Sequence, residues 1–218
     1  MLDEKLNKLK EEIYGYYLHI ESMFKKTIHG LIEKDISLLN EVINVDEKQA
    51  NEKELIIDEL CIDILALYAP RGKTLRTTLM ILKINNDLER IADHCVNISE
   101  SALRLLETPQ STSLKSTMTQ MIEYTLIMLN DAFFSFAKED SALAKDVLKR
   151  DDIVDELHHL NVRDLISEVE KKTMRAENHV DFLLISSNLE RIADLATNIA
   201  EDVIYIVEGK TCKHGKFE

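Results

Sequence analysis

Residues 88–100 read LERIADHCVNISE and residues 189–201 read LERIADLATNIAE, two copies of one segment in a single chain. Nine of the thirteen positions are identical, at a constant offset of 101 residues. A second, weaker match has an offset of 105 and relates four residues of each half: Asp35, Leu38, Val42 and Asp46 to Asp140, Leu143, Val147 and Asp151. Because both matches keep the same order, internal duplication is the economical explanation.

Residues that end helices are scarce in this chain. Only five Gly and two Pro occur among 218 residues, whereas a β-rich fold of this size needs a turn about every ten residues. Asp35 and Asp140 precede helical patterns as expected N-caps. We predict six long helices, at roughly 3–33, 35–68, 73–107, 114–137, 140–174 and 177–208. The predicted fold is all-α, with two tandem pseudo-symmetric three-helix bundles at 1–109 and 110–218 divided by the polar stretch TPQSTS.

The composition limits the class of partner. The net charge is −13 and 45% of the residues are hydrophobic, so the chain has a sizeable core but repels phosphate backbones and anionic lipids. We therefore expect no nucleic-acid partner. The N-terminus is charged and no stretch approaches 18 uninterrupted apolar residues, so we also expect no membrane insertion. Cys61, Cys95 and Cys212 are scattered, as in a reducing compartment, and we predict a cytoplasmic protein.

Acidic side chains replace apolar ones in the helical seams. Steps of three and four residues return to nearly the same face of a helix, so residues at this spacing form one stripe. In the two motif helices the stripe begins apolar and becomes acidic: Leu75, Leu79, Leu82, Asn86, Glu89, Asp93, Asn97 and Glu100, then Val180, Leu183, Ser187, Glu190, Asp194, Asn198 and Glu201. In the helices before them it is acidic in the middle: Ile43, Glu47, Asn51, Glu54, Asp58, Cys61, Leu65 and Tyr68, then Ala144, Leu148, Asp151, Asp155, His158, Val162, Leu165 and Val169.

Short connections near Pro70 and Ala176 predict antiparallel hairpins in which these acidic stripes face each other. Several half-buried carboxylates cannot all stay ionised and unpaired, because desolvation and repulsion cost on the order of several kcal/mol. Arg or Lys neutralises them, they share protons, or a cation binds; Arg90 and Arg191 lie on a face about 100° away. Oxygen-rich sites suit Mg²⁺, Mn²⁺ or iron, and His158 would favour a transition metal in the second site. The alternative is an ordinary solvated acidic face.

Enzyme motifs are incomplete or absent. A di-iron carboxylate bundle needs two Glu-x-x-His motifs, and the chain supplies one, from Glu156 to His159. The HExxH motif of zinc proteases and the GxxxxGK[ST] phosphate loop do not occur. These observations argue against an enzyme.

The two LERIAD segments resemble the LERIGD-x(4)-NI-x-E-type helix that occurs in each half of PhoU family proteins. The stretch LYAPRGKTLR at residues 67–76 is similar to the family's link between its second and third helices, and Asp151 with Asp155 matches its D-x(3)-D element. Length, duplication and helix order agree over essentially the whole chain. Ala92 and Ala193 replace the motif's usual Gly, a change that helices tolerate well.

The resemblance implies an elongated molecule, often a homodimer, with metal clusters of iron, zinc or magnesium held by paired E(D)xxxD motifs. In the second site it implies four ligands: Asp151, Asp155, Glu190 and Asp194. In the first site Glu89 and Asp93 match, and the partner helix offers either Glu47-x(3)-Asn51 or Asp46-x(3)-Ala50.

The resemblance further implies a non-enzymatic negative regulator of the phosphate response. Such proteins act between the ATPase subunit of a phosphate ABC transporter and the membrane-bound histidine kinase that senses phosphate. No residue pattern in the chain points to these partners by itself. A metal-storage or redox bundle and a metal-free helical adaptor are the alternative hypotheses.

Overall fold

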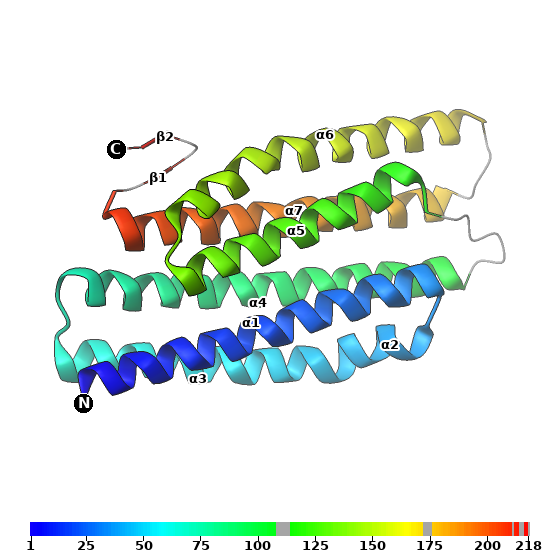
Figure 1. Ribbon diagram of the computed structural model, residues 1–218. Coiled ribbons are helices and arrows are strands. Elements are labelled where there is room, and N and C mark those ends of the chain that lie inside the picture. Colours follow the sequence, from blue (N-terminus) through cyan, green and yellow to red (C-terminus); the bar gives the residue numbers. More distant parts are fainter. Residues whose placement is uncertain (108–113, 172–175, 211, 214–215, 218) are drawn as a thin grey trace.

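The computed structural model describes residues 1–107, 114–171, 176–210, 212–213 and 216–217. In chain order its elements are α1 (Leu2–Glu33), α2 (Ile36–Glu41), the π-helical turn η1 (Val42–Asp46), α3 (Glu47–Tyr68), α4 (Gly72–Leu106), α5 (Ser116–Lys138), α6 (Ser141–Lys171), α7 (Ala176–Glu208), β1 (Cys212–Lys213) and β2 (Lys216–Phe217). The long helices run along one axis of an elongated molecule, with both termini near the same end (Figure 1). The predicted all-α fold is confirmed, and the predicted second helix corresponds to α2, η1 and α3 together. The short antiparallel pair β1–β2 was not predicted.

One aspartate caps the start of the second helix in each half, as predicted. Asp35 accepts hydrogen bonds from the backbone amides two and three residues ahead, at 2.9 and 3.2 Å. Asp140 accepts the equivalent bonds at 3.0 and 3.1 Å. Each carboxylate satisfies amides that the first helical turn leaves without partners. The duplication therefore extends to the capping of the helices.

The π-helical turn η1 interrupts the second helix of the first half, whereas its counterpart α6 is α-helical throughout the described range Ser141–Lys171. A π turn accommodates one extra residue, which accounts for part of the change in repeat offset from 105 to 101. Asp46, at the end of this turn, is buried, and both of its carboxylate oxygens accept hydrogen bonds from Lys26 Nζ, at 3.0 and 2.9 Å. His19 Nε2 donates to the Asp46 carbonyl oxygen at 2.8 Å. The Asp46 carboxylate is thus paired with Lys26. Glu47 and Asn51 are therefore the residues of the first half that correspond in the repeat to Asp151 and Asp155.

The connection between α3 and α4 reverses the chain within three residues, and so these helices form the predicted antiparallel hairpin. Ala69 and Gly72 adopt positive φ angles of 42° and 58° on either side of Pro70 and Arg71. Glycine reaches this region without strain. The turn predicted before α7 falls at residues 172–175, outside the described residues.

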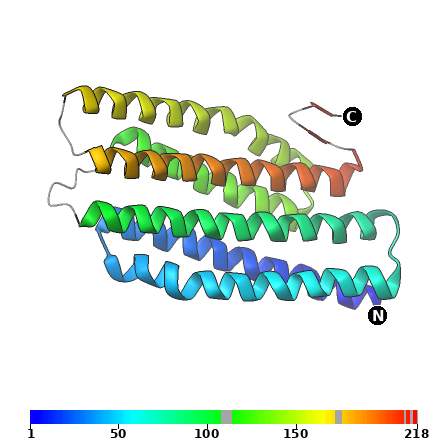
Figure 2. The same ribbon diagram turned by 180° about the vertical axis from the view of Figure 1, so that it is seen from behind.

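The motif helices α4 and α7 lie against each other at the centre of the molecule (Figures 1 and 2). The polar contacts between them include Lys83 with Asp202, His94 Nδ1 with Asn188 Oδ1 at 2.8 Å, and Arg104 Nε with Asp181 Oδ1 at 2.8 Å. The partners run in opposite order, so the helices are antiparallel. Ala92 and Ala193 are buried near the middle of this interface, where small side chains permit close approach of the helices. His94 of the first half thus connects to Asn188 of the second.

Helices α1 and α5 form a second contact between the halves. The ring of Tyr17 stacks on Phe133, with 3.9 Å between centroids and 3° between planes. The Tyr17 hydroxyl donates to Asn130 Oδ1 at 2.7 Å. The buried apolar residues of both halves belong to one continuous core. The domain boundary predicted at 109/110 lies outside the described residues.

Asp202 is a buried carboxyl group at the interface of α4 and α7. It is 4% exposed, Lys83 binds its Oδ1, and its Oδ2 has no hydrogen-bond partner. Burial raises the pKa of Asp202 to about 6, although the Lys83 ammonium opposes this rise and Glu201 adds to it. The native state therefore holds a proton on Asp202 at a pH where the unfolded chain, with an Asp pKa of about 3.9, has released it.

We expect Asp202 to make the protein less stable as the pH rises from 4 through about 6. Asp202→Asn removes this dependence, so the change in unfolding free energy between pH 5 and pH 8 should be smaller than in the wild type by about 1–2 kcal/mol. Urea denaturation in the presence of a chelator measures it. Asp63→Asn, at an exposed position of α3, serves as the control and should keep the wild-type profile. Parallel profiles for Asp202→Asn and the wild type would refute the expectation.

Within the described residues, no helix combines the length and the apolar character that crossing a membrane requires.

Candidate metal centres

Four carboxylates predicted as metal ligands lie together on α6 and α7. Asp151 and Asp155 are one turn apart on α6, and Glu190 and Asp194 are one turn apart on α7. Burial, and then the charges of neighbours that include Asp155, Asp194 and Glu190, raise the pKa of Asp151 to about 6. Partial desolvation, then Glu190 and Asp155, likewise raise the pKa of Asp194, while Arg191 and Arg90 oppose the rise. The structure thus brings these carboxylates within electrostatic range of each other, and we call them the second centre.

A groove of about 560 Å³ opens beside the second centre. Asp151 and Asp194 line it together with Arg191 and with Arg90 from the other half of the molecule. Asp151 Oδ1 is buried and has no hydrogen-bond partner. An oxygen that has lost water without gaining a donor is destabilising. A cation at this position would compensate the lost hydration of Asp151 Oδ1.

Within the described residues, no hydrogen bond or ion pair joins His158 to the carboxylates of the second centre. Its Nδ1 lies 2.9 Å from Ser186 Oγ, one turn of α7 before Glu190. Asn161 Nδ2 donates to the same hydroxyl at 3.4 Å. His158 therefore belongs to a polar contact between α6 and α7, as an ordinary polar residue would.

In the first half, Glu89 and Asp93 of α4 lie with Glu54 of α3, and we call these three residues the first centre. Burial, then Asp93 and Glu54, raise the pKa of Glu89, against the opposing charge of Arg90. Burial, Asp58 and Asp93 raise the pKa of Glu54. The position of α3 is held by Asn85, whose Nδ2 donates to the Glu54 carbonyl oxygen at 2.9 Å and to Asp58 Oδ1 at 2.8 Å.

Glu47 and Asn51, predicted as the α3 ligands of this site, are placed differently. Glu47 is half-buried and Asn51 is exposed. Neither is among the groups that raise the pKa of Glu54 or Glu89. Their roles as ligands stay predictions, whereas Glu54, one turn further along the same stripe, is the α3 carboxylate that the structure couples to α4.

Tyr16 of α1 lies next to the first centre. Its side chain is fully buried, and its hydroxyl has no hydrogen-bond partner. Burial, then the charges of Glu54, Glu89 and Asp93, raise the pKa of Tyr16, so the phenol stays protonated. Tyr16 carries no sequence signal of this role, because α1 has no acidic stripe and Tyr16 follows the apolar spacing of a core position.

Tyr16→Phe should stabilise the metal-free protein by about 1 kcal/mol, because it removes a buried hydroxyl without a partner. Tyr17→Phe is the matched control on the same helix. The Tyr17 hydroxyl donates to Asn130, so its removal should destabilise the protein by about 1 kcal/mol. Urea denaturation with chelator measures both changes. Equal destabilisation by the two substitutions would mean that the Tyr16 hydroxyl has a hydrogen-bond partner in solution.

Comparison with known proteins agrees with this duplicated arrangement. The family model described as PhoU domain matches the chain twice, at residues 16–102 and 118–203. The chain belongs to the PhoU family. The resemblance drawn from the LERIAD segments is therefore confirmed.

The PhoU relatives and structures extend over nearly the whole chain. Phosphate-specific transport system accessory protein PhoU homolog 1 of Thermotoga maritima is 33% identical over 97% of this chain and 90% of its own length. The PhoU homolog of Aquifex aeolicus is 35% identical over 98% of this chain and 96% of its own. The crystal structure of PhoU from Pseudomonas aeruginosa has a TM-score of 0.91 at 29% identity, covering 96% of this chain and all of that chain. PhoU from Streptococcus pneumoniae has a TM-score of 0.89 at 25% identity, covering 98% and 100%.

The donor atoms of both centres of this PhoU family member suit a hard metal ion, since they are carboxylate oxygens. In the described residues, however, no three His, Cys, Asp or Glu side chains converge closely enough to hold an ion in their present rotamers. Asp155 and Glu190 are half-buried and Asp194 is exposed, so these side chains have room to rotate. The unpartnered Asp151 Oδ1 is the observation that fits a cation best.

Proposed function

We propose that this chain is a non-enzymatic regulator of phosphate uptake and of phosphate-responsive signalling. The observation that carries the proposal is the likeness over 97% of the chain to a protein named as an accessory protein of a phosphate-specific transport system. The absence of a complete catalytic motif in the sequence agrees with a role that depends on binding. We further propose that the protein works in the cytoplasm as an adaptor between the transporter ATPase and a phosphate-sensing histidine kinase, as a homodimer. The net charge of −13 disfavours a nucleic-acid partner.

Metal binding is the second part of the proposal. Asp151, Asp155, Glu190 and Asp194 would hold an ion in the second centre, and Glu54, Glu89 and Asp93 would do so in the first. Bound iron, zinc, magnesium or manganese would neutralise the repulsion among these carboxylates and join α6 to α7 and α3 to α4. The raised pKa of Asp151 and its unpartnered oxygen support this part of the proposal.

A deletion strain tests the regulatory role. Without this chain, cells grown with ample phosphate should express alkaline phosphatase that the wild type represses, and phosphate uptake should no longer be restrained. Complementation with the wild-type chain should restore both. Normal repression and normal uptake in the deletion strain would rule the proposal out.

The same strain separates the metal-binding regulator from a metal-free adaptor. Complementation with Asp155→Ala plus Asp194→Ala should fail to restore repression if the ion is part of regulation, and should succeed if the bundle acts without it. Oxygen consumption on addition of ferrous iron to the purified protein would favour the metal-storage or redox alternative instead.

A further inference from the structure

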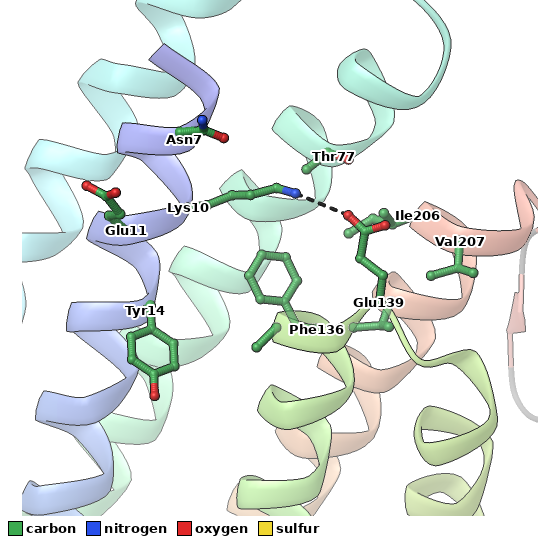
Figure 3. Close-up of a pocket in the computed structure, with 11 residues that line it drawn as sticks. Asn7, Lys10, Glu11, Tyr14, Thr77, Phe136, Glu139, Ile206 and Val207 are labelled. Carbon is green, nitrogen blue, oxygen red and sulfur yellow. Dashed lines mark hydrogen bonds and ion pairs between the residues drawn. The ribbon is translucent and has the colours of Figure 1, made fainter. Parts of the chain in front are cut away.

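A cavity of about 360 Å³ lies between the two halves, at the end of the molecule where α3 turns into α4 (Figure 3). Helices α1 and α4 of the first half and α5 and α7 of the second half contribute its walls. Its size is within the range of small-molecule sites. It is separate from both candidate metal centres and shares no lining residue with them.

Apart from Glu139, the residues of the second half that line the cavity are apolar. They are Phe136 and Ala137 of α5 with Val203, Ile206 and Val207 of α7. Tyr14 of α1 presents an aromatic ring on the opposite side (Figure 3). A ligand that fills this space must therefore have an apolar body, because a fully hydrated group would lose water here without replacement.

The polar side of the cavity carries both signs of charge, with Lys10, Glu11 and Glu139 in its lining. Lys10 Nζ lies 3.1 Å from Glu139 Oε1, and Lys73 pairs with the other oxygen of the same carboxylate. Two ammonium groups thus share one carboxylate, and these ion pairs hold the pKa of Glu139 below its usual range. Glu11 also lines the cavity, but its carboxylate points away from Lys10 (Figure 3).

Arg76 of α4 contacts the backbone of the α7 wall but does not line the cavity itself. Its Nη2 donates to the Ile206 carbonyl oxygen at 3.5 Å, and its Nε is buried without a partner. Helix α4 begins at Gly72, and its N-terminus contributes a positive partial charge. In a chain with a net charge of −13, two ammonium groups on one carboxylate are an unusual concentration of positive charge.

We propose that this cavity binds a small amphipathic anion, with an apolar body against Phe136, Val203 and Ile206 and a carboxylate or phosphate monoester head group on Lys10 and Lys73. The head group takes over one of the ion pairs of Glu139. Lys10 and Lys73 belong to the first half and Glu139 to the second, so the ligand replaces a direct ion pair between the halves. Inorganic phosphate has no apolar body and binds weakly. The proposal does not depend on metal binding or on a role in phosphate transport.

Anilinonaphthalene sulfonate, an aromatic body with one anionic group, is a suitable fluorescent probe. We expect saturable binding of one probe per chain and displacement by octanoate or octyl phosphate, with octylamine and inorganic phosphate much less effective. The comparison of octanoate with octyl phosphate distinguishes a carboxylate from a phosphate head group. Val207→Trp, which fills the cavity, should abolish the binding.

Charge variants test the orientation. Lys10→Met should weaken probe binding about tenfold. Lys25→Met is the matched control, since Lys25 is on the same helix in an exposed ion pair with Glu21, and it should leave binding unchanged. Glu139→Gln should tighten binding severalfold, because it removes the competing carboxylate. Thermal denaturation of each variant establishes that it is folded.

Three results would overturn the proposal. Weaker binding in Glu139→Gln would mean that the site prefers cations. Displacement by octylamine as effectively as by octanoate would mean that the head group makes no ion pair. A signal that survives in folded Val207→Trp would place the probe elsewhere on the protein.

Discussion

Replacing Asp155 and Asp194 with alanine should weaken metal binding at the second centre by about a hundredfold or more. Substitution of residues that only support a ligand already costs 10–100-fold in metal affinity, and this double variant removes one proposed ligand from α6 and one from α7. Elemental analysis of protein purified without chelator measures the loss. Helical content should stay nearly constant, because alanine is the best helix former.

The metal-free form of this double variant should be slightly more stable than the wild type. Asp155 and Asp194 raise the pKa of Asp151 by repulsion, and the variant removes both charges from its surroundings. Glu156→Ala plus Glu177→Ala is the matched control, since it removes two exposed carboxylates from the same helices. Unchanged metal content in the Asp155 and Asp194 variant would show that these carboxylates are not ligands.

Lys26→Met should destabilise the protein by about 2 kcal/mol. The substitution leaves Asp46 as a buried carboxylate without its counter-ion at the π turn, and breaking a buried ion pair from one side costs about 3–5 kcal/mol. We expect the smaller loss of about 2 kcal/mol because the Lys26 side chain is 27% exposed, so water already screens part of this ion pair. Chemical denaturation measures the change.

Lys25→Met again supplies the control for this prediction. Its ion pair with Glu21 is exposed, so the loss should stay below about 0.5 kcal/mol. Adding Asp46→Asn to Lys26→Met should recover part of the loss, because the stranded charge is then removed. If Lys26→Met and Lys25→Met are equally mild, Asp46 does not depend on Lys26.

The second centre could be anticipated more closely than the first. Asp151, Asp155, Glu190 and Asp194 follow the spacing of uninterrupted helices, so the facing of their stripes follows from the length of the connection. In the first half the π turn adds one residue, which rotates everything beyond it by about 100° relative to the repeat. The sequence allowed either Glu47 with Asn51 or Asp46 with Ala50 to face α4. In the structure the α3 carboxylate coupled to Glu89 and Asp93 is that of Glu54.

Other residues near the two centres could not be identified from the sequence. Tyr16 reads as one more apolar position of α1, and only the packing of α1 against α3 and α4 brings its hydroxyl to the first centre. Arg90 was assigned to a helix face away from the acids of its own half. In the structure it lines the groove of the other half, because α4 and α7 cross there.

The sequence by itself determined the duplication, the helices, their caps and the acidic stripes, because these depend on interactions within one or two turns of the same helix. The tertiary structure decided the antiparallel contact of α4 with α7, the burial of Asp202 and the Tyr16 hydroxyl, and the cavity between the halves. These features depend on the rotation of each helix about its axis against its neighbours. That rotation is set by the packing of the whole core, to which residues far apart in the chain contribute together.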